Sequence, residues 1–220
     1  MRKTRGLDGR RDPGRVVDVI NGLDAQVVAL QEADNRLGER PAALCPRLIE
    51  DNTDFRDVPV ATSEVILGWH GNAVLVHKSK AVTGVTRIDL PGLEPRGAVR
   101  VHFADGRVLV ATHLGLLRSS RRQQLERIRY ALGQIECAVI VGDFNEWRSS
   151  HGLASLAARY DVLLPGRSFH AARPVAGLDR LAHTRDQEVR DAGVDQSLLP
   201  SRASIHLPIW ADLHSRVALG

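Results

Sequence analysis

Two polar residues follow a short apolar run near the middle of the chain, and their types suit metal or phosphate chemistry. The run Ala138 to Val141 is rich in β-branched residues and stops at Gly142, which predicts a short buried strand. Asp143 and Asn145 come directly after it. Because residues at i and i+2 of an extended chain point the same way, both side chains would face one spot. There they could bind a divalent cation, polarise a water molecule or hold an anionic oxygen, although an Asp/Asn turn explains the same pattern.

Four further polar residues stand at the margins of other predicted strands. They are Glu32, His113, Asp179 and His206, each beside an apolar run. Taken singly, such a carboxylate is usually solvated and such a histidine is usually structural. However, strand ends are where sites converge in α/β proteins, so the recurrence of this arrangement favours a common site.

The order and separation of these motifs resemble those of the endonuclease/exonuclease/phosphatase superfamily, whose members have the DNase-I-like fold. The similarity covers the chain from about Asp12 to Leu213, and the ordered set is specific although no single motif is diagnostic. The matching segments are Gln31-Glu32, Thr112-His113-Leu114, Gly142-Asp143-Phe144-Asn145, Leu178-Asp179-Arg180 and Ser204-Ile205-His206-Leu207-Pro208.

The resemblance implies a role for each candidate residue. The ligands of a catalytic Mg²⁺ or Mn²⁺ would be Glu32, Asp143 and Asp179. Asp143 would also orient or deprotonate the attacking water, and Asp179 would either fix a histidine or assist the metal. Phosphate contacts would come from Asn145 and His113, while His206 would stabilise charge on the phosphoryl oxygens. The implied activity is metal-dependent hydrolysis of a phosphodiester or phosphomonoester, with a nuclease among the options.

Two departures from the family pattern favour an alternative. Ile205 stands where the family has an aspartate, and isoleucine can neither bind a cation nor accept a proton. The family also opens with a strand that carries a metal-binding asparagine, whereas the charged segment Met1 to Gly6 does not read as a buried strand. Either the start is truncated or that strand is absent. A degenerate member that binds a phosphorylated ligand or nucleic acid with little turnover therefore remains open.

Composition sets the outer bounds. A chain of 220 residues with 43% hydrophobic content can bury a real core, so we expect one domain over 1–220, with 1–11 as a flexible or truncated start. The net charge of +4 favours an anionic partner only modestly, and 4% aromatic content argues against base-stacking platforms. Two cysteines form no disulfide framework, and no apolar run is long enough for a membrane span. We expect a cytoplasmic monomer that acts on a phosphate ester, with nucleic acid as one candidate.

The elements that position these groups alternate between helix and strand at both ends of the chain, with strands alone between them. Helices are predicted over 12–24, 41–49, 120–135 and 152–159, and strands over 27–30, 73–77, 82–90, 98–103, 108–112, 138–141 and 207–213. Asp105-Gly106 is a hairpin signal, because it supplies the positive φ of a tight turn. This mixture predicts an α/β (α+β) fold with two mixed sheets packed face to face and helices outside, which is the four-layered sandwich implied by the resemblance.

Overall fold

The computed structural model describes residues 1–35, 41–148 and 152–216, and its elements follow the predicted alternation closely. The helices are η1 (Arg2–Thr4), α1 (Pro13–Gly22), α2 (Pro46–Asn52), α3 (Arg118–Leu132) and α4 (Leu198–Ala203). The strands are β1 (Val27–Leu30), β2 (Phe55–Asp57), β3 (Ala73–His77), β4 (Val82–Leu90), β5 (Arg96–Phe103), β6 (Val108–His113), β7 (Ala138–Asp143), β8 (Tyr160–Leu163), β9 (Asp179–Thr184), β10 (Gln187–Val194) and β11 (Ile209–Ser215).

The largest sheet has six strands in the order β4-β5-β6-β7-β9-β8. Only β6 and β7 run parallel, because the long helix α3 carries the chain back across the sheet between them. The other neighbours in this sheet are antiparallel. The predicted hairpin joins β5 to β6, and Gly106 has the expected positive φ of 81°.

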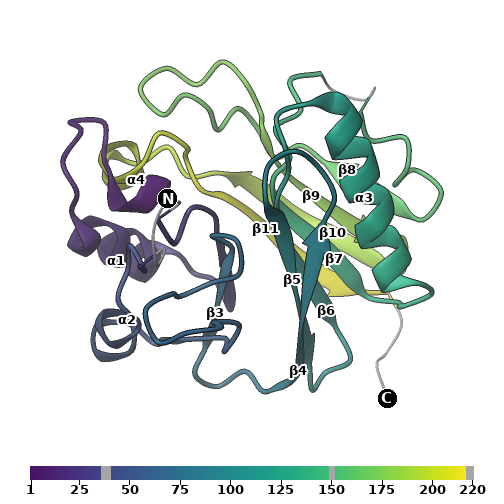
Figure 1. Ribbon diagram of the computed structural model, residues 1–220, viewed down its shortest axis with the longest axis horizontal. Helices are drawn as coiled ribbons and strands as arrows, with labels where there is room; N and C mark the ends of the chain where they lie inside the picture. The colour runs from purple at the N-terminus through teal and green to yellow at the C-terminus, as the bar shows by residue number, and fades with distance from the viewer. Residues whose placement is uncertain (36–40, 149–151, 217–220) are drawn as a thin grey trace.

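Two smaller antiparallel sheets complete the strands in the described part of the chain. One has the order β1-β3-β2 and the other pairs β10 with β11. The structure thus contains three hydrogen-bonded sheets where the sequence predicted two, and the six-stranded sheet is the mixed one. Figure 1 shows α1 and α2 on one side of the strands and α3 on the opposite side.

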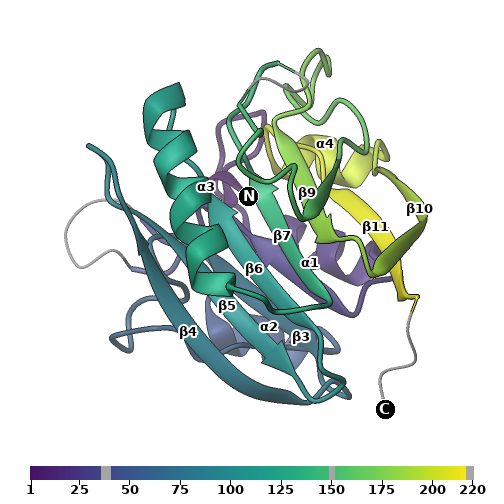
Figure 2. The ribbon, with the colours of Figure 1, turned by 90° about the vertical axis from the view of Figure 1, so that its right-hand side faces the viewer.

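Three clusters of buried side chains connect these elements. The first joins α3 to the six-stranded sheet and includes Leu125 and Ile140. The second joins α1 and α2 to the three-stranded sheet and includes Ile20 and Leu75. The third contains residues of β3 and β5, among them Val76, and so packs the two sheets against each other. In Figure 2, α3 crosses the front of β5, β6 and β7, while α1 and α2 lie behind them.

Several sequence predictions need correction. The helix expected over 152–159 is a series of turns that ends at β8, because buried Leu156 and Tyr160 anchor the chain to the sheet. The helix expected over 41–49 begins at Pro46, a residue suited to the first helical turn, and ends at Asn52. The closing strand begins after Pro208, which has no N–H to donate. Sequence patterns missed η1, β2, β8, β9, β10 and α4 altogether.

The first residues, expected to be a solvated tail, pack beside the end of β1. The Lys3 N–H donates to the Glu32 carbonyl over 3.0 Å, and the Met1 ammonium group donates to the Gln31 carbonyl over 2.9 Å. Thr4 is only 2% exposed. This segment is therefore part of the structured surface near Glu32. Among the described residues, no helix is both long and apolar enough to cross a membrane.

Candidate active site

Three of the predicted site residues form a row across neighbouring strands. In the register of the six-stranded sheet, His113 at the end of β6 is the partner of Asp143 at the end of β7. Asp143 in turn is the partner of Asp179 at the start of β9. Because β6 and β7 are parallel and β9 is antiparallel to them, all three side chains belong to one edge of the sheet. Each residue is less than 10% exposed.

Gly142 allows the strand to reach this edge. Its φ of +143° is unfavourable for residues with a side chain, and a Cβ at this position would lie 1.9 Å from the Thr112 carbonyl oxygen on β6. The glycine that ends the apolar run in the sequence is therefore required by a close approach of two backbones. It permits Asp143 to follow directly at the end of the strand.

Asp143 is surrounded by the other site residues. One carboxylate oxygen accepts a hydrogen bond from the Asn145 backbone N–H over 2.8 Å. The other lies 3.3 Å from Nε2 of His113 and 4.0 Å from Nε2 of His206. Burial, and next the negative charge of Asp179, raise the pKa of Asp143 to about 6. This carboxylate can therefore take up a proton near neutral pH, as a general base must.

Asp179 orients His206. Its Oδ2 atom accepts hydrogen bonds from Nδ1 of His206, over 2.8 Å, and from the hydroxyl of fully buried Ser168. Burial lowers the pKa of His206, but the hydrogen bond to Asp179 and the charges of Asp179 and Asp143 outweigh it, so the net shift is upward. The arrangement favours an imidazolium whose Nε2 faces the same spot as Asp143. Of the two roles predicted for Asp179, fixing a histidine is the one that this geometry supports directly.

Asn145 is held in an uncommon conformation, with φ of +50°. Its Nδ2 atom donates to the Leu114 carbonyl over 2.7 Å, which ties the loop after β7 to the loop after β6. The next residue, Glu146, accepts a hydrogen bond through its carboxylate from the buried guanidinium of Arg121 on α3, over 3.0 Å. The Arg180 guanidinium donates to the Glu146 carbonyl over 2.8 Å. These buried contacts position the Asp143–Asn145 segment from behind.

Glu32 reaches the site from the other sheet. It follows β1, has φ of +56°, and lines the same cavity as His113. The partly buried Met1 ammonium group, which donates to the Gln31 carbonyl, is influenced by the charge of Glu32 and by charges of the row on β7 and β9. Burial lowers the pKa of this ammonium group, while the charges of Glu32, Asp179 and Asp143 oppose the shift. Glu32 thus lies beside the cavity with His113, whereas the close cluster of possible metal ligands among the described residues contains Asp143, Asp179 and His206 without Glu32.

These carboxylates suit a hard divalent cation. Oxygen atoms of Asp143 and Asp179 and a nitrogen of His206 lie within 4.8 Å of one another, close enough to share an ion. The raised pKa of Asp143 reflects a negative charge that is buried beside another one, and a cation would relieve this repulsion. Mg²⁺ prefers oxygen ligands, and Glu32 adds a carboxylate of the right type. The residues present therefore fit the predicted metal.

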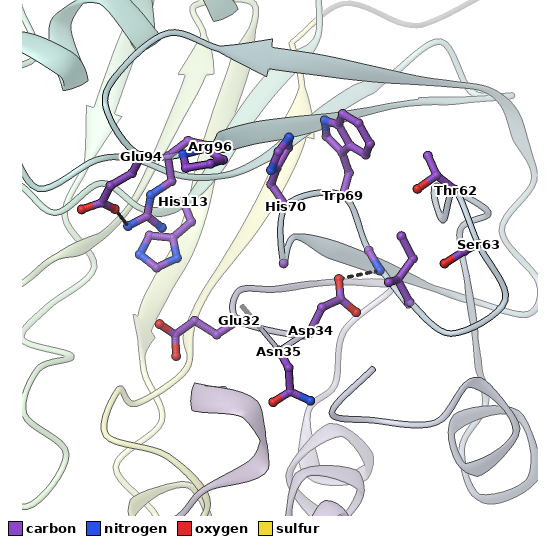
Figure 3. Close-up of a pocket in the computed structure, with 14 residues that line it drawn as sticks. Glu32, Asp34, Asn35, Thr62, Ser63, Trp69, His70, Glu94, Arg96 and His113 are labelled. Atoms are coloured by element: carbon purple, nitrogen blue, oxygen red, sulfur yellow. Dashed lines mark hydrogen bonds and ion pairs between the residues drawn. The ribbon is translucent and has the colours of Figure 1, made fainter. Parts of the chain in front are cut away.

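A cavity of about 340 Å³ opens beside Glu32 and His113. It extends along the segment before β3, where Trp69 and His70 contact each other edge to face, and reaches the start of β5 at Arg96. Figure 3 shows these side chains around the cavity, with Arg96 drawn between Glu94 and His113. The cavity places space for a ligand directly next to the acidic site.

Comparison with models of known protein families shows the family to which this chain belongs. The family model described as the Endonuclease/Exonuclease/phosphatase family matches residues 4–204. The chain belongs to this family. A search of curated protein sequences found no significant match.

Several solved structures are similar to this chain over most of its length. A Bacteroides vulgatus family member has a TM-score of 0.70 at 18% identity, covering 92% of this chain and 90% of its own. A Bacteroides thetaiotaomicron mannosyl-6-phosphatase has a TM-score of 0.68 at 13% identity, and the match covers 92% of this chain and 90% of that protein's chain. The catalytic domain of human Nocturnin, solved with a bound sulfate anion, has 0.67 at 15% identity, with coverage of 92% and 85%. The chain thus has the mixed α/β DNase-I-like fold.

Sequence reasoning missed several residues that the structure places at this family site. Ser168 lies in a long segment without any pattern, and only the folded chain brings it to Asp179. Arg96, at the start of β5, belongs to none of the sequence motifs and is buried only in the folded chain. Ile205 occupies the position of the expected carboxylate, and its carbonyl accepts the Ala171 N–H over 2.7 Å. No residue of the segment Met1 to Gly6 supplies the asparagine that the family pattern expects.

Proposed function

We propose that the protein is a metal-dependent phosphoesterase that hydrolyses a phosphate ester by in-line attack of water. The single observation that carries this proposal is the convergence of Asp143, Asp179 and His206 within 4.8 Å at the edge of a family-specific fold. The family model and the solved relatives, one of them named a phosphatase, support the reaction class. Whether the ester is a diester or a monoester, and whether nucleic acid is cleaved, are separate questions.

The residues divide the work between the attacking and the leaving side. Asp143, with its raised pKa, accepts the proton of the attacking water as the new P–O bond forms. His206, held by Asp179, stabilises the negative charge that grows on the phosphoryl oxygens while the bond to the alcohol breaks, and the leaving alkoxide takes its proton from solvent water. The side chains of Asn145 and His113 contact the phosphate from the same edge of the sheet.

The metal would be held by Glu32, Asp143 and Asp179. When bound, Mg²⁺ or Mn²⁺ supplies Lewis-acid stabilisation to the phosphoryl oxygens and lowers the pKa of a water molecule. The protein's own contribution is to hold Asp143 and Asp179 close together, with Glu32 beside the adjoining cavity. We also propose that the sheets and helices form a four-layered sandwich, which the cluster between β3 and β5 supports.

The first test is hydrolysis of bis(p-nitrophenyl) phosphate and p-nitrophenyl phosphate with Mg²⁺ or Mn²⁺ and with EDTA. We expect Asp143→Ala to lower kcat by about 100-fold or more, because the base is lost. The control is Asp161→Ala, which removes a carboxylate that is 58% exposed and pairs with Arg185 at the surface. Turnover that survives EDTA, or that is equal in Asp143→Ala and wild type, would refute the proposal.

A second candidate is a degenerate family member that binds a phosphorylated ligand or nucleic acid without turnover. The observation that favours it is Ile205, which stands directly before His206 where the family has a carboxylate. Ile205→Asp separates the two candidates. A large gain in rate or in Mg²⁺ affinity would show that the native chain lacks a needed ligand. An active wild type with no gain from this change would exclude degeneracy.

A further inference from the structure

Arg96 is a buried cation with incomplete compensation. The residue is 6% exposed, and its Nε atom has no hydrogen-bond partner among the described residues. Within the described part of the chain, Arg96 forms an ion pair with Glu94 over 2.7 Å, and the Glu94 side chain is 48% exposed. Taking a guanidinium out of water is unfavourable unless an anion and further hydrogen bonds replace the lost solvent. Glu94 is two residues away and half-exposed, so it replaces only part of the solvation that the Arg96 guanidinium loses on burial.

The position of Arg96 beside the cavity indicates which anion could complete its charge compensation. The residue lines the 340 Å³ cavity together with Glu32 and His113 (Figure 3). Burial and Asp179 raise the pKa of Asp143 overall, and the positive charge of Arg96 opposes part of this shift. Arg96 thus lies within electrostatic reach of the atoms that would carry out hydrolysis. Guanidinium groups bind phosphate oxygens with two parallel hydrogen bonds, a geometry that lysine does not offer.

The number of phosphate oxygens distinguishes two classes of ester. A phosphodiester has two terminal oxygens, for which His206, Asn145 and His113 would provide contacts and a bound metal would provide Lewis-acid stabilisation. A monoester has a third terminal oxygen and one more negative charge at neutral pH. Arg96 stands on the cavity side of the site, where it can hold that third oxygen. A cavity of 340 Å³ also has the volume of a small-molecule site, at the lower end of the usual range of about 300–1,000 Å³.

Resting on the function proposed above, we propose that Arg96 and the adjoining cavity form a subsite for a small phosphate monoester. Arg96 binds the third terminal oxygen of the dianion, and the cavity lined by Thr62, Ser63 and Trp69 accepts the alcohol group. In the absence of substrate, the Glu94 carboxylate forms an ion pair with the Arg96 guanidinium, and the phosphate displaces this carboxylate when it binds. The substrate is then a small metabolite-sized ester, and a nucleic-acid strand is the competing outcome.

A pair of substrates with one leaving group tests the role of Arg96. p-Nitrophenyl phosphate is a monoester, and methyl p-nitrophenyl phosphate is the matching diester without the third terminal oxygen. We expect Arg96→Gln to lower kcat/KM for the monoester by about 10-fold to 100-fold, the worth of a charge-assisted hydrogen bond, and to change the diester much less. Arg122→Gln, which removes an arginine that is 70% exposed on α3, is the matched control. An equal loss for both esters would overturn the proposal.

Glu94→Gln provides a test that does not depend on replacing a buried residue. Removing its charge releases Arg96, so inorganic phosphate at pH 8 should bind more tightly than to wild type, by about three-fold to ten-fold. Calorimetry with and without Mg²⁺ measures this binding. Unchanged or weaker binding would contradict the displacement of Glu94 and the proposal with it.

The two proposals fail in different ways. If wild type hydrolyses neither ester but binds phosphate in a manner that depends on Arg96 and Glu94, the hydrolase function falls and the phosphate subsite stands. If both esters are hydrolysed and Arg96→Gln affects them equally, the hydrolase function stands and the monoester subsite falls. Faster cleavage of a DNA oligonucleotide than of any small monoester would also overturn the subsite.

Discussion

At the scale of single residues, burial makes each group of the site depend on its neighbour. Burial and the charge of Asp179 raise the pKa of Asp143 to about 6, and the same Asp179 charge favours the protonated form of His206. One carboxylate therefore shifts two neighbours in the direction that the reaction needs. Such pairs of opposed groups are common where acid and base roles are divided.

This environment predicts a cost in stability. The pKa of Asp143 rises from 3.8 to about 6 on folding, so the folded protein binds the proton more tightly than the unfolded chain. Without metal, the contribution of Asp143 to stability should therefore fall as the pH rises from about 4 to about 6 and stay low above that window, which the comparison with Asp143→Asn isolates from the other carboxylates. Asp143→Asn should have a higher Tm than wild type in EDTA above this window, with the gap closing on acidification. A Tm of Asp143→Asn below that of wild type at neutral pH would contradict this.

At the scale of elements, the site depends on how closely β6 and β7 approach. These strands are the only parallel pair among the described strands, and they bring His113 and Asp143 into register. Gly142 makes the approach possible, because any Cβ there would collide with the Thr112 carbonyl. The glycine of the sequence motif is thus a packing requirement of the sheet.

Gly142→Ala should therefore destabilise the protein by about 3 kcal/mol or more, through steric overlap and an unfavourable φ. Gly22→Ala is the control, because this glycine lies at the end of α1, has no described atom within 4 Å of an added Cβ and has no positive φ. It should be neutral or stabilise by up to about 1 kcal/mol. Urea unfolding measures both. Equal stabilities would show that the β6–β7 approach is not tight.

At the scale of the whole molecule, the site lies between two packed halves. Glu32 comes from the sheet that packs on α1 and α2, while the row His113, Asp143 and Asp179 comes from the sheet that packs on α3. The cluster between the sheets couples the two halves. Glu32 keeps its place relative to the row only if both halves are folded.

We expect the two halves to unfold together. Leu125→Ala in the cluster under α3 and Leu75→Ala in the cluster under α1 each remove a fully buried side chain, so each should cost about 2–5 kcal/mol. Both variants should show one calorimetric transition at a lower Tm. Leu93→Ala, at a residue that is 89% exposed, should change stability by less than about 0.5 kcal/mol. Two separate transitions in either core variant would show that the halves fold independently.

The sequence alone determined the strongly patterned elements and the chemical types at the site. Strands β1, β3 and β4 were predicted to the residue, because alternating or continuous apolar runs bounded by glycine or polar residues leave little choice. The residues of the row, with Glu32 and His206, were also recognised from their order along the chain. Their catalytic roles remain proposals.

Only the tertiary structure decided the rest. The turns before β8, the short strand β2 and the pair β10–β11 depend on contacts with distant segments, which local patterns do not encode. The same reason explains why local sequence patterns did not identify Ser168 and Arg96 as site residues. Ser168 gains its meaning from Asp179, and Arg96 from its burial next to Glu32 and His113 around one cavity. Hydrophobic periodicity records which face of a segment is buried, but the partners of a buried polar group are set by folding.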